Sequence, residues 1–218
     1  MKLLVRYGKS GPARFGSHRD FARCFERGLR RAAIPMAYSS GFSPHPRISY
    51  INPAPTGAAS QAEYLVIGLS QIANSEEIRT RLDAAMPGGF PILEVTPFTN
   101  QQFNTSLWKV NLTGVEPARL TQAISEFQSA DQVMVSRQVK AGLRTFNVKP
   151  PVHCLQSWPV MDGWSTLTMI ISHTEPLIRP DDVLAGLLPS NPPDSHLVTR
   201  LVQSDKITVS LSHLTNQG

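Results

Sequence analysis

The hydrophobic positions of the first hundred residues switch between the two-residue period of strands and the three- to four-residue period of helices. Leu3, Val5 and Tyr7 fall on one face of an extended segment, which predicts a strand over residues 2–7. A helical stripe follows Ser17. Further elements complete this half, with extended runs at 36–39 and 47–51, strands at 63–69 and 92–96, and a helix at 74–86. This order, β-α-β-β-α-β, predicts a ferredoxin-like arrangement.

A polar segment, residues 100–106, separates this half from a second one. The second half is predicted to hold strands at 108–112, 132–139, 144–148, 165–172 and 196–202, and helices at 118–127 and from 179 onward. Because the order of elements recurs, we predict an α+β protein of two tandem ferredoxin-like halves packed side by side, residues 1–99 and 107–218. The halves share no readable sequence identity, so this prediction rests on the order alone.

Positive charge is concentrated in the first fifty residues, which hold ten Lys or Arg against two acidic residues. That segment carries +8 while the whole chain carries +5, so the remainder is negative, at −3. On the predicted helix, Arg19, Arg23 and Arg27 recur one turn apart, opposite the apolar stripe. Like charges at this spacing cost a helix roughly a few tenths of a kcal/mol per pair. The pattern therefore favours a bound polyanion, with nucleic acid the first candidate, over a solvated face that one glutamate partly compensates.

The loop Gly41–Arg47 is stiff, because Pro44 and Pro46 fix the backbone on both sides of His45. Aromatic residues in or beside this loop have two interpretations: they stack on bases, or they belong to the core of the flanking strands. These residues are Phe42, Tyr38 and Tyr50.

Arg14 lies just before the basic helix, where Gly16 and Ser17 precede backbone amides that favour a phosphate. The alternative is a plain N-cap, since Ser17 and Asp20 have the spacing of a capping box. A smaller basic group in the second half is a candidate for the far wall of the same groove, and comprises Lys140, Arg144 and Lys149. The residues predicted to bind nucleic acid are Arg14, Arg19, Arg23, Arg27, Arg31, Phe42, His45, Arg47, Lys140 and Arg144.

His18 and His45 are the candidate acid–base groups near the basic surface. A ribonuclease could use one as general base and the other as acid, whereas most histidines in such positions hydrogen-bond or cap. The other histidines show no metal-ligand spacing. Cys24 and Cys154 are too few for a disulfide framework or a four-ligand metal site, which favours free thiols in a reducing cytosol. We expect no metal, no cofactor and no membrane span, since no stretch reaches about 18 apolar residues.

A resemblance to a known family is carried by eight segments, which are 2–12, 17–21, 25–32, 38–49, 62–64, 140–148, 179–184 and 199–201. They are similar to the radical-SAM-linked family of unknown function, found as a separate chain or as the C-terminal part of a radical SAM protein. This chain has Ser43 and His45 where Asn and Arg are expected, and Asn147 where Asp is usual. The resemblance implies a companion of a radical SAM enzyme. The three-cysteine site of the iron–sulfur cluster itself is missing from the sequence.

These observations predict a cytoplasmic RNA-binding accessory protein that presents structured RNA, tRNA or rRNA, to a radical SAM modification enzyme. One alternative is a metal-independent endoribonuclease or RNA-modifying enzyme that uses His18 or His45. Another is a protein-only adaptor, whose basic face docks an acidic surface of the radical SAM partner. The order of elements is also similar to that of CRISPR repeat-cutting endoribonucleases and some pseudouridine synthases, which is an analogy of fold alone.

Overall fold

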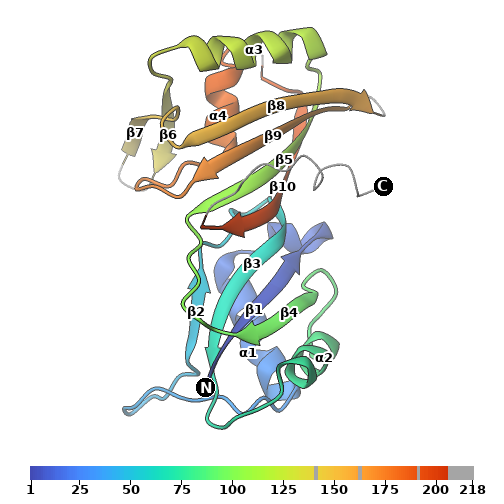
Figure 1. Ribbon diagram of the computed structural model, residues 1–218, viewed down its shortest axis with the longest axis vertical. Helices are drawn as coiled ribbons and strands as arrows, with labels where there is room; N and C mark the ends of the chain where they lie inside the picture. Colours follow the sequence, from blue (N-terminus) through green and yellow to red (C-terminus); the bar gives the residue numbers. More distant parts are fainter. Residues whose placement is uncertain (140–141, 162–163, 191, 206–218) are drawn as a thin grey trace.

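The chain forms two lobes arranged along the long axis of the molecule (Figure 1). The computed structural model describes residues 1–139, 142–161, 164–190 and 192–205. The N-terminal lobe consists of β1 (Lys2–Lys9), the 3-10 helix η1 (Gly11–Phe15), α1 (His18–Arg31), β2 (Ile48–Ile51), β3 (Ala59–Gly68), α2 (Ser75–Ala85) and β4 (Ile92–Pro97). The C-terminal lobe consists of β5 (Thr105–Thr113), α3 (Pro117–Ser129), β6 (Met134–Val139), β7 (Gly142–Asn147), β8 (Val152–Met161), β9 (Trp164–Ser172), α4 (Pro180–Leu187) and β10 (Ser195–Ser204).

One mixed sheet runs through both lobes, in the order β4-β1-β3-β10-β5-β9-β8, with β2 also paired to β3. One edge of β3 is shared, because its residues 64–67 pair with β2 and its residues 59–60 pair with β10 in parallel. The predicted α+β class is therefore confirmed. In the N-terminal lobe the element order β1-α1-β2-β3-α2-β4 matches the predicted β-α-β-β-α-β.

The prediction for the C-terminal lobe needs a correction. The segments predicted as sheet strands at 132–139 and 144–148 form the β6–β7 hairpin, which stands apart from the main sheet. Val135 and Phe146 of this hairpin are buried, as the apolar positions of these segments predict. The sequence pattern does not show which sheet a strand joins. Strand β8 was not predicted. It is an edge strand on which Leu155 is buried while its described neighbours are at most half-buried, so its sequence carries no clear two-residue alternation.

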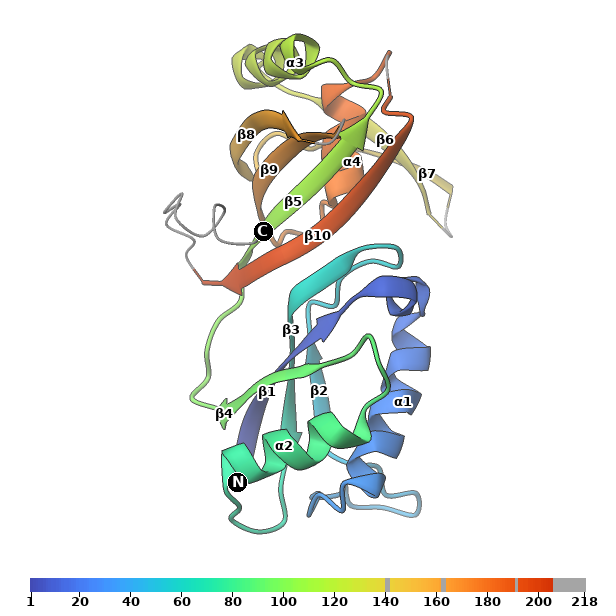
Figure 2. The same cartoon turned by 90° about the vertical axis from the view of Figure 1, so that its right-hand side faces the viewer.

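Each lobe has its own hydrophobic core. In the N-terminal lobe, Phe25 and Leu29 of α1 pack with Leu3, Leu65 and Ile67 on one face of the sheet. The opposite face carries a smaller cluster, formed by Leu4, Val66 and Phe103. In Figure 2, α1 lies along one side of the N-terminal lobe, and β10 crosses the molecule where the two lobes meet. The helices thus leave part of the opposite sheet face uncovered.

A buried ion pair joins the lobes. Arg200 of β10 is 2% exposed, and its Nη1 donates to Glu63 Oε1 of β3 at 3.0 Å. The same nitrogen donates to the carbonyl of Asn52 at 2.7 Å, and the guanidinium lies 4.5 Å from the ring centroid of Trp108. The other Glu63 oxygen accepts from the amide of Ala54 at 2.9 Å. Both charges are therefore hydrogen-bonded away from water, as buried charges must be.

A second polar cluster holds the segment between the lobes. His173 lies 2.7 Å from the carbonyl oxygen of Phe103 through Nδ1 and 2.7 Å from Ser106 Oγ through Nε2. Asn52 Nδ2 donates to the same carbonyl at 2.9 Å. Burial lowers the pKa of His173, the charge of Arg200 lowers it further, and the hydrogen bond to Phe103 opposes them. The imidazole is therefore neutral in the folded protein near pH 7.

Replacing Glu63 by Gln is expected to destabilise the protein by about 3–5 kcal/mol, because it leaves the Arg200 charge buried without its counter-charge. The matched control is Glu94→Gln, which removes an exposed ion pair with Arg6 and should cost less than about 1 kcal/mol. Urea unfolding of both variants measures the difference. Equal losses of unfolding free energy would contradict the central role of the buried pair.

Acidification should lower stability through His173. A pKa that is lower in the folded state means that the unfolded chain takes up the proton first, so this contribution is present above about pH 6.5 and declines below it. Unfolding free energies measured between about pH 7.5 and 5.5 should therefore fall for the wild-type protein and fall less for His173→Gln. Identical pH profiles for the two proteins would contradict the prediction.

Candidate nucleic-acid interface

The arginine ridge, defined as Arg19, Arg23 and Arg27 of α1, lies on the solvent side of the helix. All three side chains are exposed, on the side opposite Phe21 and Phe25, which are buried against the sheet. None of the three guanidinium groups has a hydrogen bond or an ion pair within the described part of the chain. The ridge is therefore a row of exposed positive charge, as the helical spacing predicted, and the nearby carboxylate of Asp20 offsets it only in part.

The start of α1 is a capping box. The amide of Asp20 donates to Ser17 Oγ at 3.2 Å, and the amide of Ser17 donates to Asp20 Oδ2 at 3.3 Å. Hydrogen bonds from Ser17 hold the pKa of Asp20 below its usual value, and the charges of Arg23 and Arg19 lower it further. A carboxylate thus already occupies the helix start. The geometry here favours the plain N-cap over the predicted phosphate site.

Arg31 does not belong to the ridge. Its guanidinium donates to the carbonyl of Ala85 at the end of α2. In return, Arg81 of α2 donates to the carbonyls of Ala32 and Ala33 at the end of α1, at 2.6 and 2.8 Å. The two helices cap each other's last carbonyl groups, so the charge of Arg31 serves the fold.

The segment 36–47 is a hairpin that projects from the N-terminal lobe, in light blue at the lower left of Figure 1. Its arms are joined where the amide of Ser39 donates to the carbonyl of His45 at 2.9 Å, and the amide of Arg47 to that of Ala37 at 2.8 Å. Phe42 is fully exposed and Tyr38 is half exposed, so neither is a core residue of the flanking strands. These two aromatic rings are available for stacking.

Tyr50 differs, because it packs against α1. Its ring meets the ring of His18 edge-on, with centroids 4.6 Å apart. Burial raises the pKa of Tyr50 to about 12, and the nearby charge of Glu26 raises it as well. His45 precedes Tyr50 by five residues of extended chain, which is about 16 Å at the rise of a strand. The structure therefore does not bring His18 and His45 together as an acid–base pair.

Arg47 lies on the other face of the sheet from the ridge. Ile48 pairs with Ile67 and packs on the helix-covered face, so the neighbouring Arg47, opposite Gly68, points to the open face. The predicted basic surface is consequently divided between two faces of the N-terminal lobe. Arg144 is exposed on β7 in the other lobe, and Lys140 lies outside the described residues.

Arg14 lines a hollow of about 200 Å³ between the lobes. Its guanidinium lies 4.7 Å from the ring centroid of Phe15. Asp181 and His196 line the same hollow, with Oδ1 and Nε2 2.8 Å apart. Residues 181 and 196 belong to α4 and β10, so no local sequence pattern indicates that they are neighbours.

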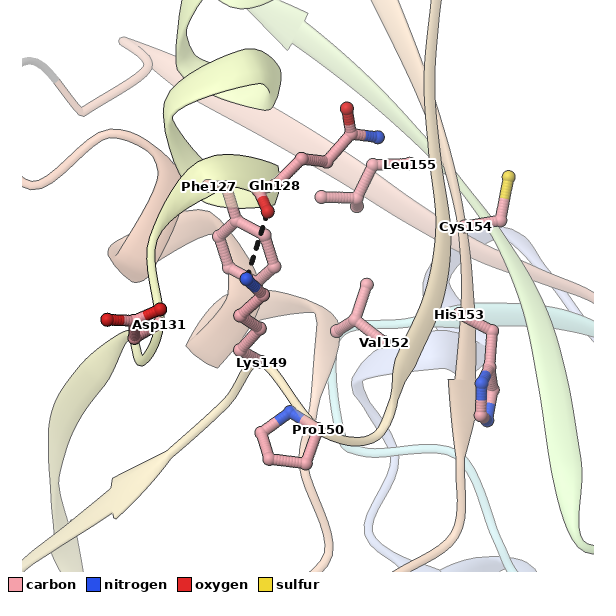
Figure 3. A pocket seen from close by; sticks show the side chains of 9 residues that line it. All are labelled: Phe127, Gln128, Asp131, Lys149, Pro150, Val152, His153, Cys154 and Leu155. Carbon is pink, nitrogen blue, oxygen red and sulfur yellow. Dashed lines mark hydrogen bonds between the residues drawn. The ribbon is translucent and has the colours of Figure 1, made fainter.

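A hollow of about 410 Å³ lies between α3 and the edge strand β8 (Figure 3). Lys149 Nζ donates to the carbonyl of Gln128 at 2.9 Å there and caps the end of α3. The side chains of Cys154 and His153 point in different directions, and His153 bonds Ser172 Oγ instead. Burial raises the pKa of the Cys154 thiol. Burial thus favours the protonated thiol, which is unlike the thiolate of a catalytic nucleophile.

Comparison with known proteins identifies the family. The model of an uncharacterised family of proteins conserved in bacteria, DUF2344, matches residues 2–180. The chain belongs to this family. No curated protein matches the sequence.

The fold is similar to that of one chain in a crystal structure of a Cbf5–Nop10–Gar1 complex, with a TM-score of 0.50 and 8% identity. The match covers 92% of this DUF2344 chain and 48% of the other, so this protein spans about half the length of the chain that it matches. At this identity the likeness concerns the fold alone.

In the ranges that the structure describes, no three His, Cys, Asp or Glu side chains are grouped so that they could hold a metal ion. None of the described helices has the length and apolar character needed to cross a bilayer.

Arg31→Ala is expected to lower the unfolding free energy by about 1 kcal/mol, because the last carbonyl of α2 loses a charged donor. Arg27→Ala, which removes the same charge from the same helix, should change it by less than about 0.5 kcal/mol. Urea denaturation compares the two variants. A larger loss for Arg27→Ala would mean that the ridge, too, holds the fold together.

Proposed function

We propose that this DUF2344 protein is a cytoplasmic RNA-binding accessory protein that holds structured RNA, tRNA or rRNA, on its arginine ridge. The observation that carries the proposal is the row of three exposed guanidinium groups one helical turn apart, none of which forms an ion pair within the described part of the chain. A helix ordinarily offsets such repulsion with acidic residues at the same spacing, as Glu26 does for Arg30 at 3.6 Å, whereas Asp20 attracts Arg23 without forming an ion pair with it. Phosphate groups would supply further counter-charge and would set affinity without reading sequence.

The sheet order supports two ferredoxin-like halves. The four main strands of the N-terminal lobe lie in the order β2-β3-β1-β4, and those of the C-terminal lobe in the order β8-β9-β5-β10. Numbered within its own lobe, each set reads second, third, first, fourth. The β6–β7 hairpin is then an insertion after α3, which the strand prediction took for part of the sheet.

The proposed partner is a radical SAM modification enzyme, on the strength of the family resemblance in the sequence. The protein would present RNA to that enzyme, with the chemistry carried by the partner. A ribonuclease activity of this chain's own is less well supported. The ring of His18 packs on the ring of Tyr50, and the extended chain between Tyr50 and His45 is about 16 Å long.

The double variant Arg23→Ala/Arg27→Ala should weaken binding of a transcribed tRNA, because each arginine neutralises a phosphate. The slope of log affinity against log salt should become shallower by about one unit for each lost contact. Fluorescence anisotropy across a salt series measures both quantities. The control is Arg79→Ala/Arg119→Ala, which removes two positive charges already paired with Glu76 and Glu126.

Two results would argue against the proposal. If both double variants lose affinity equally, net charge rather than the ridge governs binding. If the ridge variant keeps its affinity for tRNA but no longer retains the radical SAM partner after nuclease treatment, the ridge is a docking surface of a protein-only adaptor.

A further inference from the structure

A groove of about 690 Å³ lies on the open face of the N-terminal sheet, away from α1. Its lining includes the basic residues Lys2, His45 and Arg47 and the apolar residues Ile51 and Phe98. No Asp or Glu is among the described residues that line it. The groove is therefore cationic at one end and apolar along its floor, and its size falls within the range of small-ligand sites.

The cationic end is built around a glycine. Lys2 pairs with Gly68 across one side of β3, and the Gly68 amide donates to the Arg47 carbonyl across the other at 2.9 Å. Neighbouring strands are about 4.8 Å apart, so the backbones of Lys2 and Arg47 stand about 10 Å apart with Gly68 between them. A Cβ on Gly68 would lie 3.1 Å from the Cβ of Arg47. The Arg47 Cδ would lie 3.7 Å from the same Cβ, so the absence of a side chain at Gly68 leaves room for the stem of Arg47 over this strand, on the side of Lys2.

The rest of the groove offers surfaces for bases. Ile51, Val66 and Phe98 belong to the small apolar cluster of the open face, and they line the groove together with Gly68. The hairpin that supplies His45 and Arg47 also carries the exposed ring of Phe42. Proteins bind unpaired strands by this combination of a positively charged track and apolar or aromatic faces.

We propose that this groove binds an unpaired segment of RNA, with a phosphate held by Lys2 and Arg47 and a base on the floor of Ile51, Val66 and Phe98. The identity of the ligand as RNA rests on the proposed function. A paired base cannot reach the floor, because its face is stacked and its edge is paired, so this site selects single strands. The arginine ridge, on the opposite side of the same lobe, holds the paired part of the molecule.

Fluorescence anisotropy with two probes separates the sites: an oligouridine of about ten nucleotides and a blunt RNA hairpin without unpaired ends. Arg47→Ala and Lys2→Ala should each weaken binding of the oligouridine by about tenfold and change binding of the hairpin little. Arg23→Ala/Arg27→Ala should do the reverse. Arg79→Ala, which removes a positive charge paired with Glu76, is the control. The five substituted side chains of these four variants are exposed or partly exposed, and urea unfolding checks that the fold is kept.

The outcomes distinguish this inference from the proposed function. If Arg47→Ala and Lys2→Ala leave oligouridine affinity unchanged while the ridge variant loses the hairpin, the groove is not an RNA site and the ridge proposal stands. If the ridge variant keeps the hairpin while Arg47→Ala loses the oligouridine, the ridge proposal fails and the groove stands. Loss of binding to polyglutamate, but not to oligouridine, on Arg47→Ala would mean that the groove takes an acidic peptide and would overturn the inference.

Discussion

The buried pair of Arg200 and Glu63 is the interaction on which the arrangement of the lobes depends. Two charges taken out of water are costly unless each is held by several partners. Here the partners come from both lobes: the carbonyl of Asn52 and the amide of Ala54 on one side, and the ring of Trp108 on the other. Among the described residues, the sheet itself crosses the boundary through two residue pairs of β3 and β10. Side-chain hydrogen bonds and this ion pair therefore strengthen the connection between the two lobes, which backbone pairing alone makes weakly.

The two faces of the sheet in the N-terminal lobe form two different surfaces. On one side α1 covers the sheet and turns the arginine ridge outward. On the other side none of the described helices covers the sheet near β2, where Arg47 and Gly68 border a groove. A protein with cations on both faces of one thin lobe can hold a folded polyanion at two places. The separation of the two surfaces also explains why one compact basic patch, expected from charge counting, is not observed.

Much of the N-terminal lobe could be predicted from the sequence because its signals are local. The helical spacing of Phe21, Phe25 and Leu29 is enough to place α1, and the Ser17–Asp20 capping box marks its start. The C-terminal lobe is harder to predict from the sequence, because alternation shows only that one side of a strand is buried. The segments that contain Val135 and Phe146 have buried apolar positions, yet they form a separate hairpin. The sequence of β8 hardly alternates, although this strand is part of the main sheet.

The sequence by itself determined the arginine ridge, since side chains three and four residues apart on a helix must share a face. It also determined that the 36–47 segment is a stiff turn between extended arms. Only the tertiary structure decided that Arg31 caps α2 and that Arg47 faces away from the ridge. Only the tertiary structure, too, brings Glu63 into contact with Arg200, which lies 137 positions away in the sequence. The physical reason is that these contacts depend on strand register and helix packing, which bring together residues that no local spacing relates.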